Sequence, residues 1–397
     1  MTDQKPLAGL KVLDMTRVLA GPFATMLLSD LGADVLKVEM PETGDDSRGF
    51  GPFKNGRSLY FVSINRGKRS MTLNLKAPEG REILRRLVAQ HDVLVENFRP
   101  GVMEKLELGY EQLREINPRL IYAAASGYGH SGPDSRKPAY DILAQAAGGI
   151  MSVTGWPGGD PTRVGYSIGD IGAALFTTVG ILAAVAQRAQ TGQGQKIDVA
   201  MLDCQVAMLE NALARFQVSG KNPEPLGNRH PTISPFQAYR TADEWMVIAV
   251  GNDGLWRTFC DVLDRPDLAS DERFVTNAAR TENLEHLNQI IEPLLAARTA
   301  AAWTELFAAR GIPHSTIDRI EQVMTNPQIR ARNMLVQVDD PVAGTVQVAG
   351  NPIKMSSMAD ETTRPPVPEL GEHTNEVLAS LGYDQGQIEK LRAQRAV

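Results

Sequence analysis

Short apolar segments alternate with amphipathic ones along the first half of the chain. The short segments are rich in β-branched and other apolar residues, which is typical of buried strands. They cover residues 11–16, 34–40, 70–75, 92–97 and 120–126, and a similar run follows at 196–202. We therefore expect strands at these positions.

Helical patterns fill most of the intervals between the expected strands. Residues 21–33 have Pro22 in the first turn and Gly32 near the end, the usual asymmetry of a helix. Residues 78–91 place four apolar side chains on one helical face: Ile83, Leu84, Leu87 and Val88. Strands that alternate with helices in this way predict an α/β fold, with a mostly parallel sheet covered by helices on both faces.

The most apolar segment spans residues 171–186. It is 16 residues long and contains Gly and Thr, so it is too short and not hydrophobic enough to cross a bilayer. It predicts a buried helix from about residue 170 to 190, where the polar run TGQGQ ends it.

The chain changes character after residue 217. Residues 218–235 are rich in Pro, Gly and Asn, which is typical of a linker. The next segment, 236–325, predicts a smaller α+β domain, with a strand at 245–250 and helices near 253–264, 282–297 and 300–310. The remainder, 326–397, holds a predicted hairpin at 334–350 and C-terminal helices, and it is too short for a core of its own. We therefore expect a Rossmann-like large domain, 1–217, that the smaller domain interrupts and 326–397 completes.

Charge and cysteine content exclude several classes of protein. The formal net charge is -6 and no block of Lys and Arg is present, so we expect neither a nucleic-acid nor a membrane partner. The two cysteines, Cys204 and Cys260, form no CxxC pair, and the six histidines are scattered. This argues against a disulfide framework and against a metal site. The first residues lack an apolar h-region, so we expect no signal peptide and a cytoplasmic protein.

One carboxylate stands alone at the start of the long apolar segment. In GYSIGDIGAALF, residues 165–176, Asp170 is the one charged residue, and the next along the chain is Arg188. Asp is common at the N-cap of a helix, so a structural role is one interpretation. A carboxylate nucleophile is the other, and the two roles are compatible.

Two common functions of α/β proteins do not fit the motifs. The turn after the first strand, TRVLAGPFA, lacks the GxGxxG of a dinucleotide site and has Pro22 where a glycine is needed. The chain has no GxSxG elbow and no cysteine in a recognisable nucleophile context. A nicotinamide dehydrogenase and a serine hydrolase are therefore disfavoured.

A series of motifs resembles a known family across essentially the whole chain. The run RVLAGPFATM at 17–26 is similar to the N-terminal signature of the family III coenzyme A transferases, which include formyl-CoA transferase and carnitine CoA-transferase. Further signatures follow in the expected order: LGADVLKVE (31–39), GDDSRGFGP (44–52), NRGKRSMTLNLK (65–76), DVLVENFRPG (92–101), ASGYGHSGP (125–133), IGD (168–170), TGQGQKIDVAM (191–201) and LGEHT (370–374). The chain is identified on these motifs as a member of that family, closest to its dicarboxylate-handling branch.

The resemblance implies covalent catalysis by Asp170. In the family the matching Asp attacks an acyl-CoA thioester to form a mixed anhydride, and the CoA thiolate adds back to give an aspartyl-CoA thioester. An acceptor carboxylate then collects the CoA through a second anhydride. The attack needs an ionised Asp170, which we expect the N-terminal dipole of its helix to favour. Carboxylic acids have similar pKa values, so this exchange needs neither ATP nor a metal.

Two alternative functions stay open beside the transferase. The α-methylacyl-CoA racemases share the N-terminal motifs, but they move a proton with a His in the segment that corresponds to residues 137–145. This chain has Tyr140 there, and a phenol with a pKa of about 10 is a poor proton carrier at neutral pH. Tyr140 instead resembles the acyl-pocket tyrosine of the transferases. A non-catalytic CoA-binding protein is the other alternative.

The resemblance places the coenzyme A pocket on several segments of the chain. The matching residues are Val18, Leu19 and Ala20 near the thiol arm, Leu73 and Lys76 by the nucleotide with Asn97 and Phe98, and Lys105 and Lys137 toward the phosphates. Coenzyme A and acyl-CoA are substrates here, so no permanently bound cofactor is expected. Leu19 and Met40 depart from formyl-CoA transferase, which has Gln and Arg there, and the change at Leu19 argues against formate and oxalate as substrates.

A dicarboxylate acceptor needs a cation for its distal carboxylate, and arginine offers bidentate pairing. The candidates are Arg17, Arg48, Arg66, Arg229 and His230. We expect Arg48 or His230, or both, to hold the acceptor. The expected donor is an acyl-CoA such as succinyl-CoA, and the expected acceptor is a small carboxylate such as glutarate, itaconate or malate. The resemblance also implies a homodimer of interlocked chains.

Overall fold

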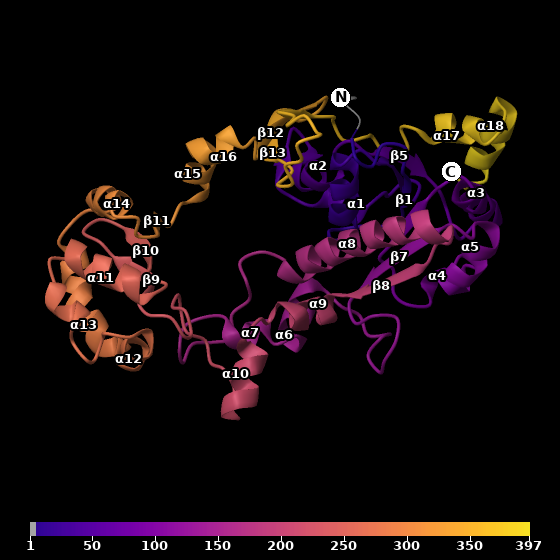
Figure 1. The fold of residues 1–397 in the computed structure, drawn as a ribbon. Helices are drawn as coiled ribbons and strands as arrows, with labels where there is room; N and C mark the ends of the chain where they lie inside the picture. Colours follow the sequence, from indigo (N-terminus) through magenta and orange to yellow (C-terminus); the bar gives the residue numbers. More distant parts are fainter. Residues whose placement is uncertain (1–4) are drawn as a thin grey trace. The chain divides into compact units, whose positions relative to one another are not determined.

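The computed structural model describes residues 5–397, which form two compact units. The first unit comprises the chain up to Met151, Arg163–Ser219 and Pro327–Val397, and the second comprises Ser152–Thr162 and Gly220–Asn326. Figure 1 follows the chain from the N-terminus, in indigo, to the C-terminus, in yellow. Beside the small domain expected at 236–325, the second unit thus takes in the Pro- and Gly-rich segment before it and eleven residues, 152–162, from earlier in the chain.

A six-stranded parallel sheet forms the centre of the first unit (Figure 1). Its strands are β1 (Lys11–Asp14), β2 (Asp34–Glu39), β5 (Arg69–Thr72), β6 (Val93–Glu96), β7 (Ile121–Ser126) and β8 (Lys196–Ala200). They lie in the order β5-β2-β1-β6-β7-β8, and every neighbouring pair is parallel. This is the doubly wound order of a Rossmann-like sheet, so the α/β class expected from the sequence is confirmed.

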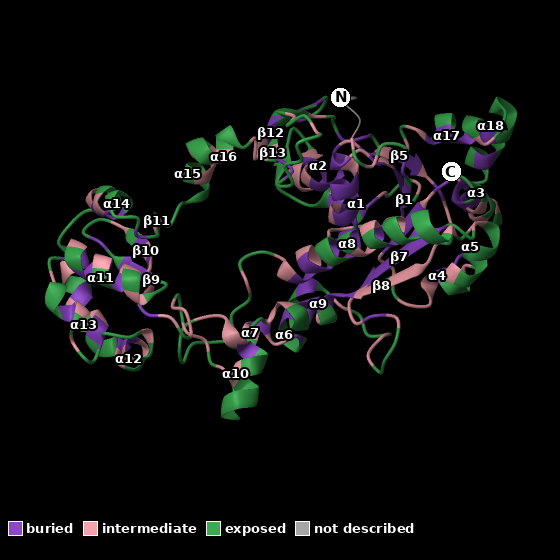
Figure 2. Cartoon of the chain, in the orientation of Figure 1, coloured by how far each residue is buried: buried purple, intermediate pink, exposed green. Residues whose placement is uncertain are grey.

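Helices cover both faces of the sheet because strand side chains alternate between two apolar clusters. Figure 2 shows β1 and β7 coloured as buried. On one face, four strand residues pack with α1 (Ala20–Asp30) and α8 (Ile168–Thr191): Val12, Val35, Val93 and Ile121. On the other face, Leu13, Leu36, Leu94 and Tyr122 pack with α3 (Pro78–Val88), α5 (Tyr110–Ile116), α17 (Thr374–Ser380) and α18 (Gln385–Ala393). The C-terminal helices therefore belong to the core of the first unit.

Helix α8 contains the long apolar segment of the sequence. By length and composition it could cross a membrane, but its inner face packs against β7, β8 and α1. The expectation of a buried helix is only half right, because Leu175, Phe176 and Val179 are exposed on its outer face. A helix in the outer layer of a sheet protein is covered on one face only, and nothing in the described chain covers the other.

The hairpin expected at 334–350 is formed by β12 (Leu335–Asp340) and β13 (Gly344–Ala349), which pair antiparallel. A short strand, β14 (Thr363–Arg364), pairs parallel with β12. Phe61 and Val62 of α2 (Leu59–Asn65) pack against Val338 of this sheet. Short elements complete the unit and its borders: η1 (Asp46–Gly49), β3 (Phe53–Lys54), β4 (Arg57–Ser58), α4 (Val102–Lys105), α6 (Asp141–Ala147), α7 (Ile150–Val153), α9 (Met201–Met208), α10 (Ala212–Ser219) and α16 (Pro327–Ala331).

The second unit packs helices on a three-stranded antiparallel sheet, in the order β11-β10-β9. Its strands are β9 (Phe236–Arg240), β10 (Trp245–Ala249) and β11 (His314–Thr316). Its helices are α11 (Asp253–Val262), η2 (Pro266–Ala269), α12 (Asn277–Glu282), α13 (Leu284–Ala296), α14 (Ala300–Ala309) and α15 (Ile320–Thr325). Aromatic side chains dominate the core, among them Trp256, Phe259 and Phe307. The strand and the three helices expected in this segment are confirmed.

The turn between β1 and α1 brings two parts of the chain unusually close. A Cβ atom built on Gly21 would lie 2.3 Å from the Cβ atom of Thr16, far inside van der Waals contact. Helix α1 can begin at this point only because residue 21 is glycine. Pro22, the next residue, has a backbone angle that suits the first turn of a helix.

We predict that Gly21→Ala lowers the free energy of unfolding by about 1–3 kcal/mol, the usual cost of forcing extra atoms into a packed core. Gly49→Ala is the matched control, because nothing lies within 4 Å of the Cβ atom it would carry. Urea denaturation followed by circular dichroism measures both variants. Equal denaturation midpoints for the two would contradict the tight turn.

Candidate active site

The order of the strands locates a ligand site at the carboxyl ends of β1 and β6. From β1 the sheet continues to β2 and β5, whereas from β6 it continues the other way, to β7 and β8. Such a switch point opens a crevice between the two loops that leave these strands. Here the loops are joined directly. The Asn97 side chain accepts the backbone N–H of Arg17 at 3.0 Å and donates to the Arg17 carbonyl at 2.8 Å.

A cavity of about 220 Å³ is lined by residues of both loops. Its apolar lining includes residues of β2, of α4 and of the loops near them: Val38, Leu73, Leu75, Phe98, Val102 and Leu106. Arg17 and Lys76 contribute positive charge to the lining. Three residues expected in the coenzyme A pocket, Leu73, Lys76 and Phe98, are thus brought together by the fold.

After Met15, whose backbone N–H binds the carbonyl of Val95, side chains hold the loop that leaves β1. Thr16 donates its backbone N–H to Asp14 at 2.9 Å, and its carbonyl accepts a hydrogen bond from Lys37 at 2.7 Å. Val18 donates its backbone N–H to Oδ1 of Asp45 at 3.0 Å. Arg17 lies between them, and the Asn97 side chain binds both its N–H and its carbonyl. The position of this loop therefore depends on four side chains: Asp14, two residues before Thr16, and Lys37, Asp45 and Asn97 from more distant parts of the chain.

Val18 begins the turn into α1 with a φ angle of 68°, in the left-handed region that β-branched residues rarely occupy. Leu19 and Ala20 follow at the start of the helix. Ala20 packs with Ala173, which lies one turn after Asp170 on α8. The three residues expected near the thiol arm therefore lie next to the helix that carries the candidate nucleophile.

Two lysines without solvent exposure lie beneath this loop. Lys68 Nζ pairs with Asp14 at 2.8 Å, and Lys37 Nζ pairs with Asp45 at 2.8 Å. Burial alone would raise the pKa of Asp14, but the two lysines reverse this and hold that pKa below its ordinary value. Burial lowers the pKa of Lys68 to about 8, whereas the carboxylates around Lys37 outweigh burial and raise its pKa. Both pairs are therefore charged at neutral pH, which buried ions allow only when closely paired.

The two lysines expected near the phosphates lie away from this cavity. Lys105 is exposed at the end of α4. Lys137 is exposed in the loop before α6 and pairs with Asp134 at 2.8 Å. Neither lines the cavity, so their assignment to coenzyme A stays a prediction.

Asp170 is the third residue of α8 and not its N-cap, which is Ser167. The capping role considered for Asp170 from the sequence is therefore wrong. Within residues 5–397 its carboxylate accepts no hydrogen bond, although the residue is half-buried. An acid in such a place has no structural partner to satisfy, which is typical of a functional group.

A second carboxylate, Asp141 in the first turn of α6, holds the start of α8. Its Oδ1 accepts the backbone N–H of Gly169 at 2.7 Å, and its Oδ2 accepts a hydrogen bond from Gln145 at 2.7 Å. Burial, and then the charge of Asp141, raises the pKa of Asp170 from an ordinary 3.8 to about 7. The helix terminus was expected to favour ionised Asp170, but burial and Asp141 together raise the pKa of this carboxyl group. No motif in the sequence singled out Asp141.

Tyr60 on α2 is a further site residue that the sequence did not reveal. Burial raises the pKa of its phenol to about 12, and the charges of Asp170, Asp45 and Asp141 add to this. The phenol is therefore protonated at neutral pH and can donate a hydrogen bond. Tyr140, the tyrosine expected in the acyl pocket, precedes α6 with 76% of its surface exposed. Only the packed structure reveals that Tyr60 lies close enough for these charges to act on it.

Arg48 already has partners for its whole guanidinium group. Nε and Nη2 each donate to Glu39 at 2.7 Å, and Nη1 donates to the carbonyl of Pro368 at 3.2 Å. The group also lies over the ring of Phe61, 4.0 Å from its centroid. A bidentate pair of this kind is structural, so the geometry disfavours Arg48 as the cation for the acceptor.

The other candidate cations have different surroundings. His230 lies in the second unit, where its Nδ1 accepts the backbone N–H of Thr232 at 3.1 Å, which leaves Nε2 as the protonated nitrogen. Arg66 is buried and pairs with Asp30 at 2.9 Å. Arg17 is exposed and lines the cavity. Arg17 is thus better placed than Arg66 to meet a substrate in the cavity, and the assignment of His230 to the acceptor stays a prediction.

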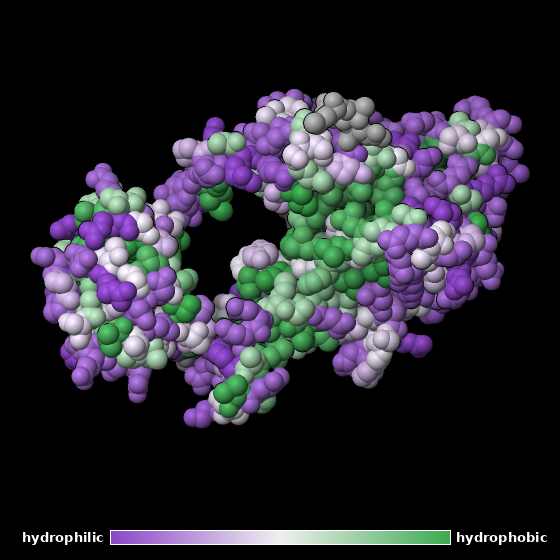
Figure 3. Space-filling view, viewed as in Figure 1, coloured by the Kyte–Doolittle hydropathy of each residue, from purple (hydrophilic) through white to green (hydrophobic). Residues whose placement is uncertain are grey.

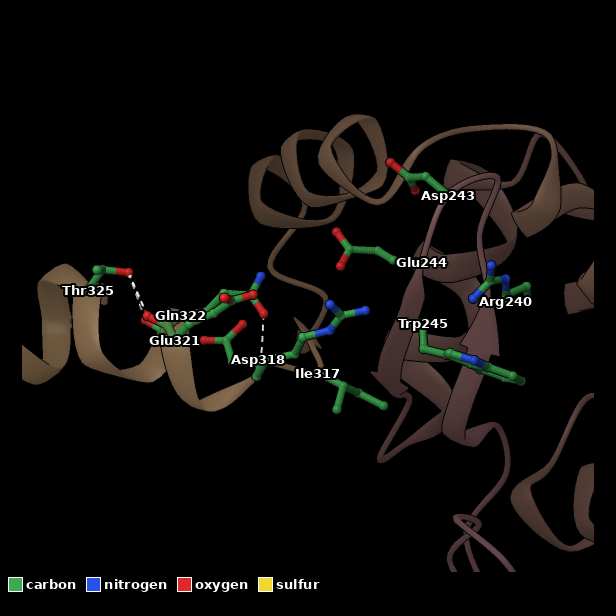
Figure 4. A pocket seen from close by; sticks show the side chains of 10 residues that line it. Arg240, Asp243, Glu244, Trp245, Ile317, Asp318, Glu321, Gln322 and Thr325 are labelled. Carbon is green, nitrogen blue, oxygen red and sulfur yellow. Dashed lines mark hydrogen bonds between the residues drawn. The ribbon is translucent and has the colours of Figure 1, made fainter. Parts of the chain in front are cut away.

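The second unit has a hollow of its own, of about 770 Å³ (Figure 4). Arg240 and Trp245 lie on the strands at one side, and Asp318 and Glu321 come from the segment around α15 at the other. Four carboxylates line this hollow against two guanidinium groups, so it would repel the phosphates of coenzyme A. It contains none of the residues expected in the site.

Comparison with known proteins identifies the relatives of this chain. Residues 7–374 match the family model described as CoA-transferase family III. The acetyl-CoA:oxalate CoA-transferase of Acetobacter aceti is 45% identical over 92% of this chain and 93% of its own length. The succinyl-CoA:glutarate CoA-transferase of Mus musculus is 41% identical over 98% of this chain and 89% of its own length. A solved CAIB/BAIF family protein from Brucella suis superposes with a TM-score of 0.83 at 40% identity, covering 95% of this chain and 100% of that one.

The fold and these relatives define an enzyme that transfers coenzyme A. The chain belongs to CoA-transferase family III, which confirms the resemblance drawn from its motifs. The argument from Leu19 against oxalate stays a prediction, and it contrasts with the name of a relative that is 45% identical and is named for oxalate. Oxalate therefore joins the acceptors to be tested.

We predict that kcat/KM for CoA transfer rises with pH and levels off above about pH 7. A carboxylate nucleophile must be ionised to attack a thioester, and the pKa of Asp170, the expected nucleophile, is about 7. Asp141→Asn removes the neighbouring negative charge, so the break in the profile should move to lower pH. Steady-state rates across the neutral range measure both profiles.

Glu96→Gln is the control for this profile, since burial also raises the pKa of Glu96 to about 7. The break should stay in place in that variant. A break that follows Glu96, or one that Asp141→Asn leaves unmoved, would contradict the assignment to Asp170.

Proposed function

We propose that this chain moves coenzyme A from succinyl-CoA to a small dicarboxylate or related carboxylate, with Asp170 as the nucleophile. The observation that carries this proposal is the state of Asp170, a half-buried carboxylate with no hydrogen-bond partner in residues 5–397 and a pKa raised to about 7. Two relatives support the acceptor class, since one is named for oxalate and the other for glutarate. Glutarate, itaconate, malate and oxalate are the acceptors we would try.

The reaction would proceed by successive exchanges at one carboxyl group. Asp170 attacks the thioester carbonyl, forming an aspartyl anhydride and releasing CoA thiolate. The thiolate attacks the aspartyl carbonyl, forming an aspartyl-CoA thioester and releasing succinate. The acceptor carboxylate attacks this thioester to give a second anhydride and free thiolate, which then takes the acyl group of the acceptor and restores Asp170. Each step exchanges a carboxylate for a thiolate, so atoms and charge balance throughout.

Asp141 and Tyr60 would prepare Asp170 for this attack. Asp141 fixes the first turn of α8 through the backbone of Gly169, so the nucleophile is oriented before substrate binds. Tyr60 stays protonated, and its hydroxyl would donate a hydrogen bond to the oxygen that gains charge in the tetrahedral intermediate.

The cavity at the ends of β1 and β6 would hold the nucleotide end of coenzyme A. Leu73 and Phe98 offer apolar surface for a flat purine, and Lys76 offers charge for a phosphate. Residues 18–20 would guide the thiol arm from the cavity toward α8. The exposed lysines that would add charge from the solvent side are Lys105 and Lys137.

Exposed apolar side chains on the first unit support a homodimer, which we propose acts in the cytoplasm. Figure 3 shows apolar surface over α8 and α10, where the exposed residues are Leu175, Phe176, Val179, Leu213 and Phe216. Monomeric proteins rarely expose a contiguous apolar patch of this kind. The partner we propose is a second copy of this chain, interlocked with the first as the family resemblance implies.

We predict that His230→Ala raises the KM for the acceptor about tenfold, the loss expected for one charge-assisted hydrogen bond. Arg48→Ala should instead lower the melting temperature, because it leaves the buried Glu39 without its partner. Initial rates with the four acceptors at saturating succinyl-CoA separate the two effects. If both variants keep the wild-type acceptor KM, neither residue holds the acceptor.

We predict that mixing the protein with succinyl-CoA in the absence of acceptor produces a covalent adduct on Asp170. The anhydride and the aspartyl thioester both react with hydroxylamine, so a hydroxamate should be found at this residue by intact-mass and peptide mass spectrometry. Asp170→Asn is the matched control, since it keeps the size of the side chain but removes the nucleophile, and it should give no adduct.

An adduct on a different residue would remove Asp170 from the mechanism. No adduct from several acyl-CoA donors, together with exchange of the α-proton in heavy water, would favour the racemase reaction. Binding of coenzyme A with neither reaction would leave a non-catalytic protein.

A further inference from the structure

The strained backbone at Val18 needs an explanation, because the turn that contains it separates the coenzyme A cavity from α8. Its φ angle is 68°, and a branched Cβ makes this left-handed conformation costly. Such a residue keeps the conformation only where its surroundings determine it. What holds Val18 therefore also sets where Leu19 and Ala20 begin α1.

One carboxylate holds the turn from below. Oδ1 of Asp45 accepts the N–H of Val18 at 3.0 Å, and it also accepts the backbone N–H of Ser47 at 2.9 Å and the Ser47 hydroxyl at 2.7 Å. Oδ2 pairs with Lys37 Nζ at 2.8 Å. Both oxygens are therefore engaged, and Asp45 is only 3% exposed, so its carboxylate cannot turn away from Val18.

The ammonium group of Lys37 binds the same turn at a second point. Lys37 Nζ donates to the carbonyl of Thr16 at 2.7 Å, two residues before Val18. The Thr16 carbonyl and the Asp45 carboxylate, which accepts the N–H of Val18, thus both bind the ammonium group of Lys37. Lys37 has no solvent exposure, and electrostatic interactions in such surroundings are strong and directional.

The turn acts on the candidate nucleophile through packing. Ala20 contacts the cluster that contains Ala173, one helical turn beyond Asp170. A shift at Val18 would move this end of α1 along α8, and the thiol arm would move with it.

We propose that Asp45 and Lys37 are positioning residues for CoA transfer, which hold Val18 in its left-handed conformation and so set the approach of the thioester to Asp170. This inference rests on the proposed function of Asp170. The pair acts through the backbone of Val18 and not by reacting with substrate. Its removal should therefore slow the chemical step more than it weakens binding of acyl-CoA.

The first test is Asp45→Asn, which keeps the shape of the side chain but removes the charge that pairs with Lys37. We expect kcat to fall about 10²-fold, the effect of a small misplacement of reacting groups. The KM for succinyl-CoA should change by less than about threefold, because the cavity walls remain.

The decisive variant is Val18→Gly, because glycine adopts a φ angle of 68° without strain. In the Val18→Gly background, Asp45→Asn should lower kcat by less than about tenfold, so the two changes are coupled. A carboxylate that only stabilises the fold would lower kcat by the same factor in both backgrounds.

Asp30→Asn is the matched control in the same unit. Asp30 is buried, pairs with Arg66 and Arg364, and lies at the other end of α1. Its loss should lower the melting temperature without a change in kcat. If Asp45→Asn does not fold, Lys37→Arg keeps the charge but changes the geometry, and it is measured in the same two backgrounds.

The outcomes separate this inference from the function on which it rests. If the wild type forms the Asp170 adduct and Asp45→Asn keeps kcat, or loses it equally with and without Val18→Gly, the positioning role is overturned and the proposed function stands. If the wild type forms no adduct, both are overturned. Loss of kcat that Val18→Gly relieves supports the positioning role.

Discussion

The geometry of the site depends on residues 16–18 of the loop that leaves β1, which make no backbone–backbone hydrogen bonds within residues 5–397. At the switch point between β1 and β6, neighbouring loops diverge, so no strand is available to bind residues 16–18. Side chains bind them instead, and the two lysines that take part are fully buried. Ions in such a place are tolerated only when every charge has a partner. The loop, the cavity beside it and the start of α1 are thus determined together by one buried set of charges.

The pKa values of two buried acids in the first unit shift in opposite directions. Asp14 and Asp170 are both removed from water, which raises the pKa of a carboxyl group. Two lysines reverse this for Asp14, whereas the charge that acts on Asp170 is the carboxylate of Asp141, and the pKa of Asp170 rises to about 7. Divergent pKa values within one site are how a protein separates acids that maintain structure from acids that react. Asp14 and Asp45 belong to the first kind, and Asp170 has the properties of the second.

Two residues show why motifs in the sequence located the site better than they assigned roles. Arg48 lies within a family motif and was expected to hold the acceptor, but the fold places it against Glu39 at the end of β2. Tyr140 adjoins another motif and is largely exposed, whereas Tyr60, which no argument from the sequence selected, responds to the charge of Asp170. A motif contains information about residues that are adjacent in sequence. It does not show which residue a long side chain contacts in the folded protein.

The sequence by itself determined the six strands of the central sheet, several of the helices, the α/β class, the family and the candidate nucleophile. These follow from periodicity and from short motifs, which are local properties of the chain. The strand order, the raised pKa of Asp170, the role of Asp141 and the strained turn at Val18 were decided only by the tertiary structure. Each depends on groups far apart in sequence: 27 residues separate Val18 from Asp45, and 28 separate Gly169 from Asp141. Burial and the distances between charges exist only once the chain has packed.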